Sequence, residues 1–151
     1  MAKKKKFVSE SKVVMTQFVL PNDTNTLNNL MGGRLMHWMD IAAAISAQKH
    51  SNRITVTASV DNISFSKPIH LGDVLTLEAQ VTRSFNSSME IYIKVKSENI
   101  PAGSSQSTNS AFITFVAVDQ MGKPIDVPDV VPETEEEKEL YAGALRRRQL
   151  R

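Results

Sequence analysis

A single carboxylate interrupts the most apolar stretch of this sequence. Residues 34–49 contain neither glycine nor proline, and Asp40 lies there between Met39 and Ile41. Because the stretch is long enough for a helix that is apolar nearly all round, we expect Asp40 to be buried, which would raise the pKa of its carboxyl group. A carboxylate with a raised pKa is suited to act as a general base. The alternative is an ordinary aspartate on the helix surface or in a structural hydrogen bond.

An asparagine-rich loop precedes this predicted helix. Residues 21–29 are dense in side chains that hydrogen-bond to their own backbone, and Asn25 lies there, 15 residues before Asp40. Its amide group has the donor and the acceptor needed to orient a water molecule or a carbonyl group. Asn22 and Asn29 are competing candidates, and asparagine in a loop is more often a turn former than a catalytic residue.

Two consecutive glycines, Gly32 and Gly33, open the helix. The first backbone N–H groups of a helix have no partner within it, so they can bind a carbonyl oxygen that becomes an oxyanion. Glycine also allows a substrate to approach the backbone closely. The plainer interpretation of this pair is a tight turn.

Other reaction classes find little support in the composition. None of the 151 residues is a cysteine, which excludes a disulfide framework, a thiolate zinc site and a cysteine nucleophile. The three histidines, His37, His50 and His70, share no metal-ligand spacing, and no glycine-rich phosphate loop is present. We therefore expect neither a metal site nor a resident cofactor.

The hydrophobic pattern predicts the elements that position these residues. Strands are expected where apolar and polar residues alternate or where strand-forming residues accumulate. They cover residues 12–20, 55–65, 75–82, 89–96 and 107–118, with an irregularity near Asp61 and Asn62. The third and fourth form an antiparallel hairpin with one solvated face, and the fifth is apolar on both faces and therefore interior. Thr134 and three glutamates begin a terminal helix that ends in arginines.

These elements predict an α+β architecture. An antiparallel sheet of about five strands wraps around one long buried helix, and a second helix lies at the C-terminal end. This arrangement is the hotdog fold. A sheet that covers a single helix has two open edges, and pairing with a second copy would close one of them, so at least a dimer is expected.

The charged residues are unevenly distributed. Lys3 to Lys6 and the arginines at 146–148 and 151 supply eight of the 18 basic residues, which leaves ten against 16 acidic residues between the two clusters. A nucleic-acid binder more often has a basic stripe on a folded face. We predict a disordered basic tail over residues 1–10 and one domain over residues 11–151. No apolar run has the length of a membrane span or signal peptide, so a cytoplasmic protein without membrane contact is expected.

Several separated motifs follow one another in a specific order. They are Asp23-Thr24-Asn25, Met31-Gly32-Gly33, Trp38-Met39-Asp40, Thr57-Ala58-Ser59-Val60-Asp61 and the hairpin residues 82–91. In this order they resemble the cytosolic acyl-CoA hydrolases and their bacterial relatives, which are acyl-CoA thioesterases of the hotdog superfamily. The resemblance extends from about residue 15 to residue 148.

The resemblance implies a reaction, a site and an assembly. The expected reaction is hydrolysis of an acyl-CoA to a free fatty acid and CoA, so that coenzyme A is part of substrate and product and not a cofactor. Asn25 and Asp40 are implied to be the catalytic pair and to come from different subunits of a dimer. Such enzymes usually assemble as trimers of dimers. Contacts to CoA are implied for Ala58, Ser59, Val60, Ser87, Ser88, Met89 and Arg148.

Alternatives stay open on sequence grounds. Asp40 either activates water as a general base or attacks the thioester directly. An acyl-thioester dehydratase would need a histidine for its acid–base pair, and none lies in the Asn25 loop. A non-catalytic acyl-CoA or nucleotide-binding regulatory module is the alternative from a different functional class, against which the presence of both Asn25 and Asp40 argues.

Overall fold

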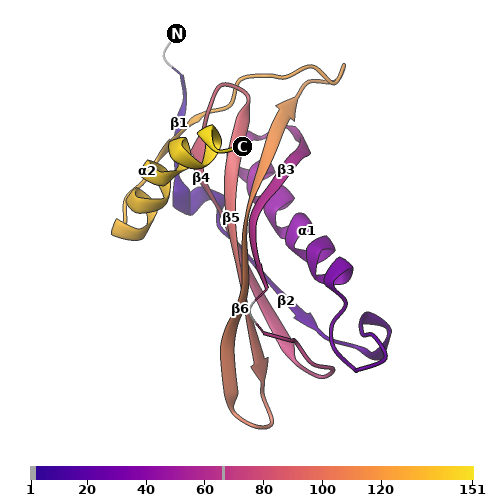
Figure 1. The fold of residues 1–151 in the computed structure, drawn as a ribbon. Helices are drawn as coiled ribbons and strands as arrows, with labels where there is room; N and C mark the ends of the chain where they lie inside the picture. Colours follow the sequence, from indigo (N-terminus) through magenta and orange to yellow (C-terminus); the bar gives the residue numbers. More distant parts are fainter. Residues whose placement is uncertain (1–2, 66) are drawn as a thin grey trace.

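The computed structural model of the chain describes residues 3–65 and 67–151. Figure 1 shows the strands and the two long helices in the order of the chain. The strands are β1 (Lys5–Phe7), β2 (Val13–Phe18), β3 (Ile54–Phe65), β4 (Val74–Ser84), β5 (Ser88–Asn99), β6 (Ser104–Val118) and β7 (Asp129–Val131). The helices are α1 (Gly32–Ser51), α2 (Glu135–Gln149) and the short 3₁₀ helices η1 (Val8–Ser11) and η2 (Pro21–Asp23).

One antiparallel sheet contains all five predicted strands. Their order is β2–β4–β5–β6–β3, so β6 is interior, as predicted, and β2 and β3 are the edges. The predicted hairpin is β4–β5. The predicted irregularity in β3 is confirmed by a register shift between Asp61 and Ser64, where Asn62 has a positive φ of 52°. A second shift, between Thr57 and Ser59, was not predicted.

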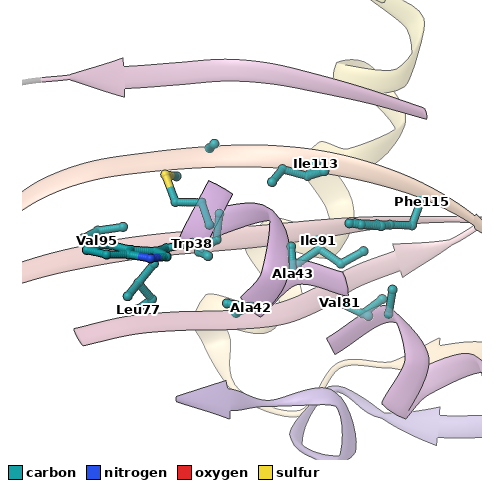
Figure 2. Packing of buried hydrophobic residues seen from close by; sticks show 14 of the residues in the cluster. Trp38, Ala42, Ala43, Leu77, Val81, Ile91, Val95, Ile113 and Phe115 are labelled. Atoms are coloured by element: carbon teal, nitrogen blue, oxygen red, sulfur yellow. The ribbon is translucent and has the colours of Figure 1, made fainter. Parts of the chain in front are cut away.

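The core lies between α1 and one face of the sheet. Trp38, Ala42 and Ala43 of α1 pack against apolar side chains of β4, β5 and β6 (Figure 2). The sheet residues labelled in that view are Leu77, Val81, Ile91, Val95, Ile113 and Phe115. Small alanine side chains allow the helix backbone to approach the sheet closely, so that these larger sheet residues fill the interface.

The prediction that α1 is buried nearly all round is wrong for a single chain. The sheet covers only one side of the helix, and on the other side Ile41 and Ile45 are 36% and 41% exposed. Asp40 is half-buried for the same reason. The apolar residues that predicted a fully buried helix therefore form an exposed apolar face in one copy of the chain.

The prediction of a disordered tail over residues 1–10 is also wrong for the part that the structure describes. Lys5–Phe7 forms β1, which pairs in parallel with β7, and Val8 is buried in the core. The Lys6 ammonium group donates hydrogen bonds to the Lys49 carbonyl and to Asn52 Oδ1 at the end of α1. A cation at a helix C-terminus is favourable because the last carbonyl groups lack partners within the helix.

Helix α2 begins at the predicted cap and covers the face of the sheet opposite α1. The Glu137 amide donates to Thr134 Oγ1 at 3.1 Å, and Glu137 Oε1 accepts from the Thr134 amide. Under α2 lies Glu90, which alternation placed on the solvated face of the hairpin but which is fully buried. Two hydrogen bonds from Arg147, at 2.9 and 2.7 Å, and one from Thr82 at 2.6 Å hold its carboxylate.

His50, at the end of α1, is a buried titratable group between α1 and the segment that leads to β7. Its Nε2 donates to the Pro128 carbonyl oxygen at 2.7 Å, because that oxygen can only accept. Its Nδ1 is buried and has no hydrogen-bond partner. Burial lowers the pKa of His50 below its ordinary value of 6.5, since protonation would create a buried N–H group without an acceptor.

We therefore predict that this fold loses stability as the pH falls below about 6.5. In that range the unfolded chain binds a proton that the folded chain does not, so the free energy of unfolding decreases with decreasing pH. The free energy of unfolding, measured with urea at pH 7.5 and at lower pH, should depend less on pH in His50→Gln than in wild type. His37→Gln, at an exposed position of α1, is the control that should keep the wild-type dependence. An unchanged dependence in His50→Gln would contradict the assignment.

Candidate active site

Asp40 is held by a strand residue that the sequence did not single out. Thr57 Oγ1, on β3, donates a hydrogen bond of 2.9 Å to Asp40 Oδ1. The carboxylate is half-buried in a single chain and not buried as predicted, which leaves room for a substrate or a second chain to approach it. One oxygen is thus fixed by the threonine, and the structure provides a carboxylate of defined orientation beside the open edge of the sheet.

A bulge in β3 makes this contact possible. In a regular strand, residues two apart point to the same face. Here the register shifts between Thr57 and Ser59. As a result, Thr57 bonds to Asp40 on α1, whereas Ser59 donates to Asp61, which pairs with Arg151 beyond α2 on the other face. Bulges often change the direction of side chains next to active sites. The motif at residues 57–61 contains this bulge, but nothing in the sequence predicted it.

Asn25 lies in an exposed, ordered turn before α1. Its Oδ1 accepts hydrogen bonds from the amides of Leu27 at 2.9 Å and Asn29 at 3.2 Å. Asn25 therefore does have the turn-forming role that the sequence offered as the alternative to a catalytic role. The side-chain nitrogen Nδ2 of Asn25 has no hydrogen-bond partner among the described residues, so the turn fixes the side chain through Oδ1 and leaves its donor end exposed. In Asn29, the competing candidate, Oδ1 accepts a hydrogen bond of 2.9 Å from His70 Nδ1.

Gly32 and Gly33 form the exposed first turn of α1. The carbonyl of Met31 accepts the first bond of the helix, from the Leu35 amide at 3.1 Å. The glycine N–H groups precede that bond and point out of the helix. A cavity of about 290 Å³ opens beside Gly32, and its lining combines the apolar Leu30, Leu35, Pro68 and Ile69 with the polar Asn29, Lys67 and Asn109. Helix N–H groups next to a partly apolar cavity suit a carbonyl group with an aliphatic substituent.

The helix keeps Gly32 and Asp40 of one chain apart. They are eight residues apart on α1, which corresponds to about 12 Å along its axis. One thioester group cannot contact both of them. If both residues act on the same carbonyl, the N-terminus of α1 and the carboxylate must therefore come from different copies of the chain.

The residues predicted to contact CoA differ in their accessibility. On β3, Ala58 is exposed, whereas Ser59 and Val60 are half-buried. Ser87 and Ser88 are half-buried at the β4–β5 turn. Met89 is 0% exposed and belongs to the core, so its predicted contact with CoA is incompatible with this structure. Its sequence neighbour Ser88 begins the strand, and alternation then directs Met89 inward.

Arg148 lies near the same turn. Its guanidinium carbon is 4.2 Å from the centre of the Phe85 ring, and its side chain is exposed. The structure thus brings the predicted hairpin and arginine contacts together at one end of the sheet. Among the described residues, no group of three histidine or acidic side chains is placed to hold a metal ion. No helix in the described part of the chain is long and apolar enough to cross a membrane.

Comparison with known proteins gives one consistent result. The sequence pattern of the thioesterase superfamily matches residues 27–103. The acyl-CoA thioester hydrolase YkhA of Bacillus subtilis, itself uncharacterized, is 49% identical over 94% of this chain and 83% of its own length. The cytosolic acyl coenzyme A thioester hydrolase of Rattus norvegicus is 39% identical over 89% of this chain, which spans 36% of that longer protein.

Solved structures agree with this relationship. A hexameric acyl-CoA thioesterase superposes with a TM-score of 0.94 at 43% identity, over 97% of this chain and 94% of the other. An acyl-CoA hydrolase from Staphylococcus aureus, in complex with butyryl coenzyme A, coenzyme A and coenzyme A disulfide, gives 0.90 at 39% identity, over 96% and 88%. The chain belongs to the thioesterase superfamily. The predicted resemblance, the hotdog fold and the assignment to the thioester hydrolases are therefore confirmed.

For this thioesterase we predict that Thr57→Val lowers the rate of thioester hydrolysis about tenfold or more. The change removes one hydrogen bond to a charged group, which contributes roughly 1.5–3 kcal/mol, while the similar shape of valine preserves the packing. Thr55→Val is the matched control on the same strand, because the Thr55 hydroxyl is buried without a partner. Thermal unfolding should be similar in both variants. Equal turnover in the two variants would show that Thr57 does not orient Asp40.

Proposed function

We propose that this protein hydrolyses acyl-CoA thioesters to a carboxylic acid and CoA, at a site that two copies of the chain share. The observation that carries the proposal is the oriented Asp40 carboxylate beside the open edge strand β3. Asp40 and Thr57 of one copy would face Asn25 and Gly32 of the other. The separation of Gly32 from Asp40 along α1 supports the division between copies.

Variants of the Staphylococcus aureus hydrolase support this choice of residues. Solved structures of that enzyme replace an asparagine, an aspartate and a threonine by alanine, and these positions are 15 and 17 residues apart along its chain. Asn25, Asp40 and Thr57 of this chain have the same residue types, the same order and the same two spacings. The residues that were replaced in that enzyme therefore match Asn25, Asp40 and Thr57 in type, order and spacing.

The proposed mechanism assigns one task to each group. Asp40 acts as a general base and removes a proton from the water that attacks the thioester carbonyl. Asn25 orients that water or the carbonyl with its exposed amide donor, and the N–H groups at Gly32 and Gly33 stabilise the developing oxyanion. The bond from carbon to sulfur then breaks. A thiol has a pKa of roughly 8.5, so the leaving thiolate needs little acid assistance, and no histidine is required.

The same proposal includes the binding of CoA and the assembly. Ala58, Ser59, Val60, Ser87 and Ser88 line the path of CoA, and Arg148 faces its phosphate groups, for which guanidinium groups are well suited. The exposed Ile41 and Ile45 and the open strand β3 are covered by a second copy. Similarity to a hexameric thioesterase supports three such dimers per particle, and similarity to a cytosolic hydrolase supports a cytoplasmic location.

Asp40→Asn should lower the turnover of acetyl-CoA at least about 100-fold, the low end for loss of a general base. The amide keeps the shape and can still accept the bond from Thr57, so assembly and unfolding temperature should be unchanged. Release of thiol, followed with a thiol reagent, measures the reaction. Asp126→Asn, at an exposed loop position, is the control that should retain full activity. No thiol release by wild type would favour a non-catalytic binding module, and near-normal release by Asp40→Asn would remove the base from the mechanism.

Mixing two inactive proteins tests the shared site. Asn25→Ala and Asp40→Ala are mixed under conditions that exchange subunits, and each mixed dimer then contains one intact site and one doubly defective site. Random exchange makes half of the dimers mixed, so about a quarter of the wild-type activity should return. Mass measurement confirms the exchange. Confirmed exchange without recovered activity would place Asn25 and Asp40 of the same chain in one site.

A further inference from the structure

Segments from opposite ends of the sequence meet at the β4–β5 turn. Figure 1 shows the start of β1 and the end of α2 beside this turn, at one end of the sheet. The Lys3 ammonium group donates to the Phe85 carbonyl at 3.3 Å, and the Arg148 guanidinium lies over the Phe85 ring at 4.2 Å. One cation therefore contacts the backbone of Phe85 and the other its ring, and Ser87 and Ser88 follow Phe85 at the same turn.

The turn that carries Phe85 is held rigidly. The Phe85 amide donates to Ser88 at 2.8 Å, the Val127 amide donates to the Asn86 carbonyl at 3.0 Å, and the Ala117 amide donates to the Ser87 carbonyl at 2.9 Å. Lys3 is held by its own chain, because the Asp129 amide donates to the carbonyl of the adjacent Lys4. The two cations are therefore presented by fixed backbone, which lowers the entropy lost when an anion binds.

Two neighbouring arginines, Arg147 and Arg151, already have carboxylate partners. Arg147 and Arg151 both pair with the buried Glu90, and Arg151 also pairs with Asp61. Arg148 has no carboxylate partner among the described residues, and its side chain is exposed. Lys3 has one, Asp129, at 3.5 Å, whose side chain is 50% exposed. Lys4, Lys5 and Arg146 are also exposed without an ion pair among the described residues. What distinguishes Lys3 and Arg148 is that both contact Phe85.

We propose that Lys3 and Arg148 form a two-sided clamp across Phe85 that binds the phosphate groups of CoA. The proposal rests on the proposed function for the identity of the ligand, and it assigns a task to Lys3, the first residue of a lysine cluster to which the sequence assigned no function. CoA has a diphosphate and a separate 3′-phosphate on its nucleotide, so two cations can bind it at two points. Ammonium is suited to a single phosphate as a point charge, and guanidinium to paired oxygens.

A purely structural role for Lys3 is the competing explanation. Its bonds to Phe85 and Asp129 would then serve only to fasten β1 and the segment before β7 to the turn. The two roles differ in the effect of Asp129. A carboxylate beside a phosphate clamp repels the ligand and competes for the lysine, whereas a carboxylate in a structural fastening contributes to it.

Calorimetric binding of adenosine 3′,5′-bisphosphate tests the clamp without requiring hydrolysis. Lys3→Met should weaken binding roughly fivefold, the effect of about 1 kcal/mol expected for a partly exposed charge, and Arg148→Met should weaken it at least as much. Lys5→Met is the matched control, because Lys5 is an exposed lysine of β1 with no ion pair among the described residues. It should bind like wild type. Asp129→Asn should bind at least as tightly as wild type.

The kinetic counterpart uses two substrates. Lys3→Met should raise KM for acetyl-CoA roughly fivefold with kcat little changed, and it should leave acetyl-pantetheine, which lacks the nucleotide, unaffected. Wild-type bisphosphate affinity in Lys3→Met, weaker binding in Asp129→Asn, or an equal loss on both substrates would overturn the clamp. If wild type binds the bisphosphate through Lys3 but releases no thiol, the clamp stands and the proposed hydrolysis fails.

Discussion

The packing of α1 against one side of a single sheet is the constraint on which the rest of this structure depends. Ala42, Ala43 and Ala47 are fully buried and let the helix lie close to the strands. The described residues of one copy leave the opposite side open, where Asp40 lies between the core and the exposed Ile41 and Ile45. A fold of this kind buries its core within one chain but leaves the environment of its carboxylate to be completed from outside.

The same constraint separates the groups that we propose to react, which are spread along α1. A straight helix cannot bring its N-terminal N–H groups and a carboxylate two turns later to the same atom. Two antiparallel copies of such a helix can, if they overlap in their N-terminal halves, because the N-terminus of one then lies beside the middle of the other. The bulge at Ala58 belongs to the same arrangement. It directs Thr57 toward the helix and Ser59 toward the opposite face, so that one edge strand serves both the carboxylate and the outer surface.

Features of this fold were predictable where they depend on neighbouring residues, and were missed where they depend on residues far apart in the sequence. The five strands, the β4–β5 hairpin and the cap at Thr134 follow from local patterns, and all are present. Alternation indicates on which face of a strand a residue lies, but it does not indicate which other element covers that face. Glu90 was therefore expected on a solvated face, although α2 covers it. Its partner Arg147 is 57 residues away. The Thr57–Asp40 bond depends on an unpredicted bulge, and the β1–β7 pairing joins segments more than a hundred residues apart.

Much of the charge at the two ends of the sequence makes specific contacts within the fold. Lys6 donates a hydrogen bond to a carbonyl group in the last turn of α1, and Lys3 donates one to the β4–β5 turn. Arg147 and Arg151 both form ion pairs with Glu90. A buried carboxylate of this kind adds little net stability when fully paired but is costly to leave with one partner removed. The main role of Glu90 is therefore to position α2: its ion pairs hold the last turns of that helix over the sheet. Because Arg147 is held there, the next residue, Arg148, projects over Phe85 instead of pairing with the same carboxylate. The buried carboxylate thus helps to place Arg148 where it can bind an anion.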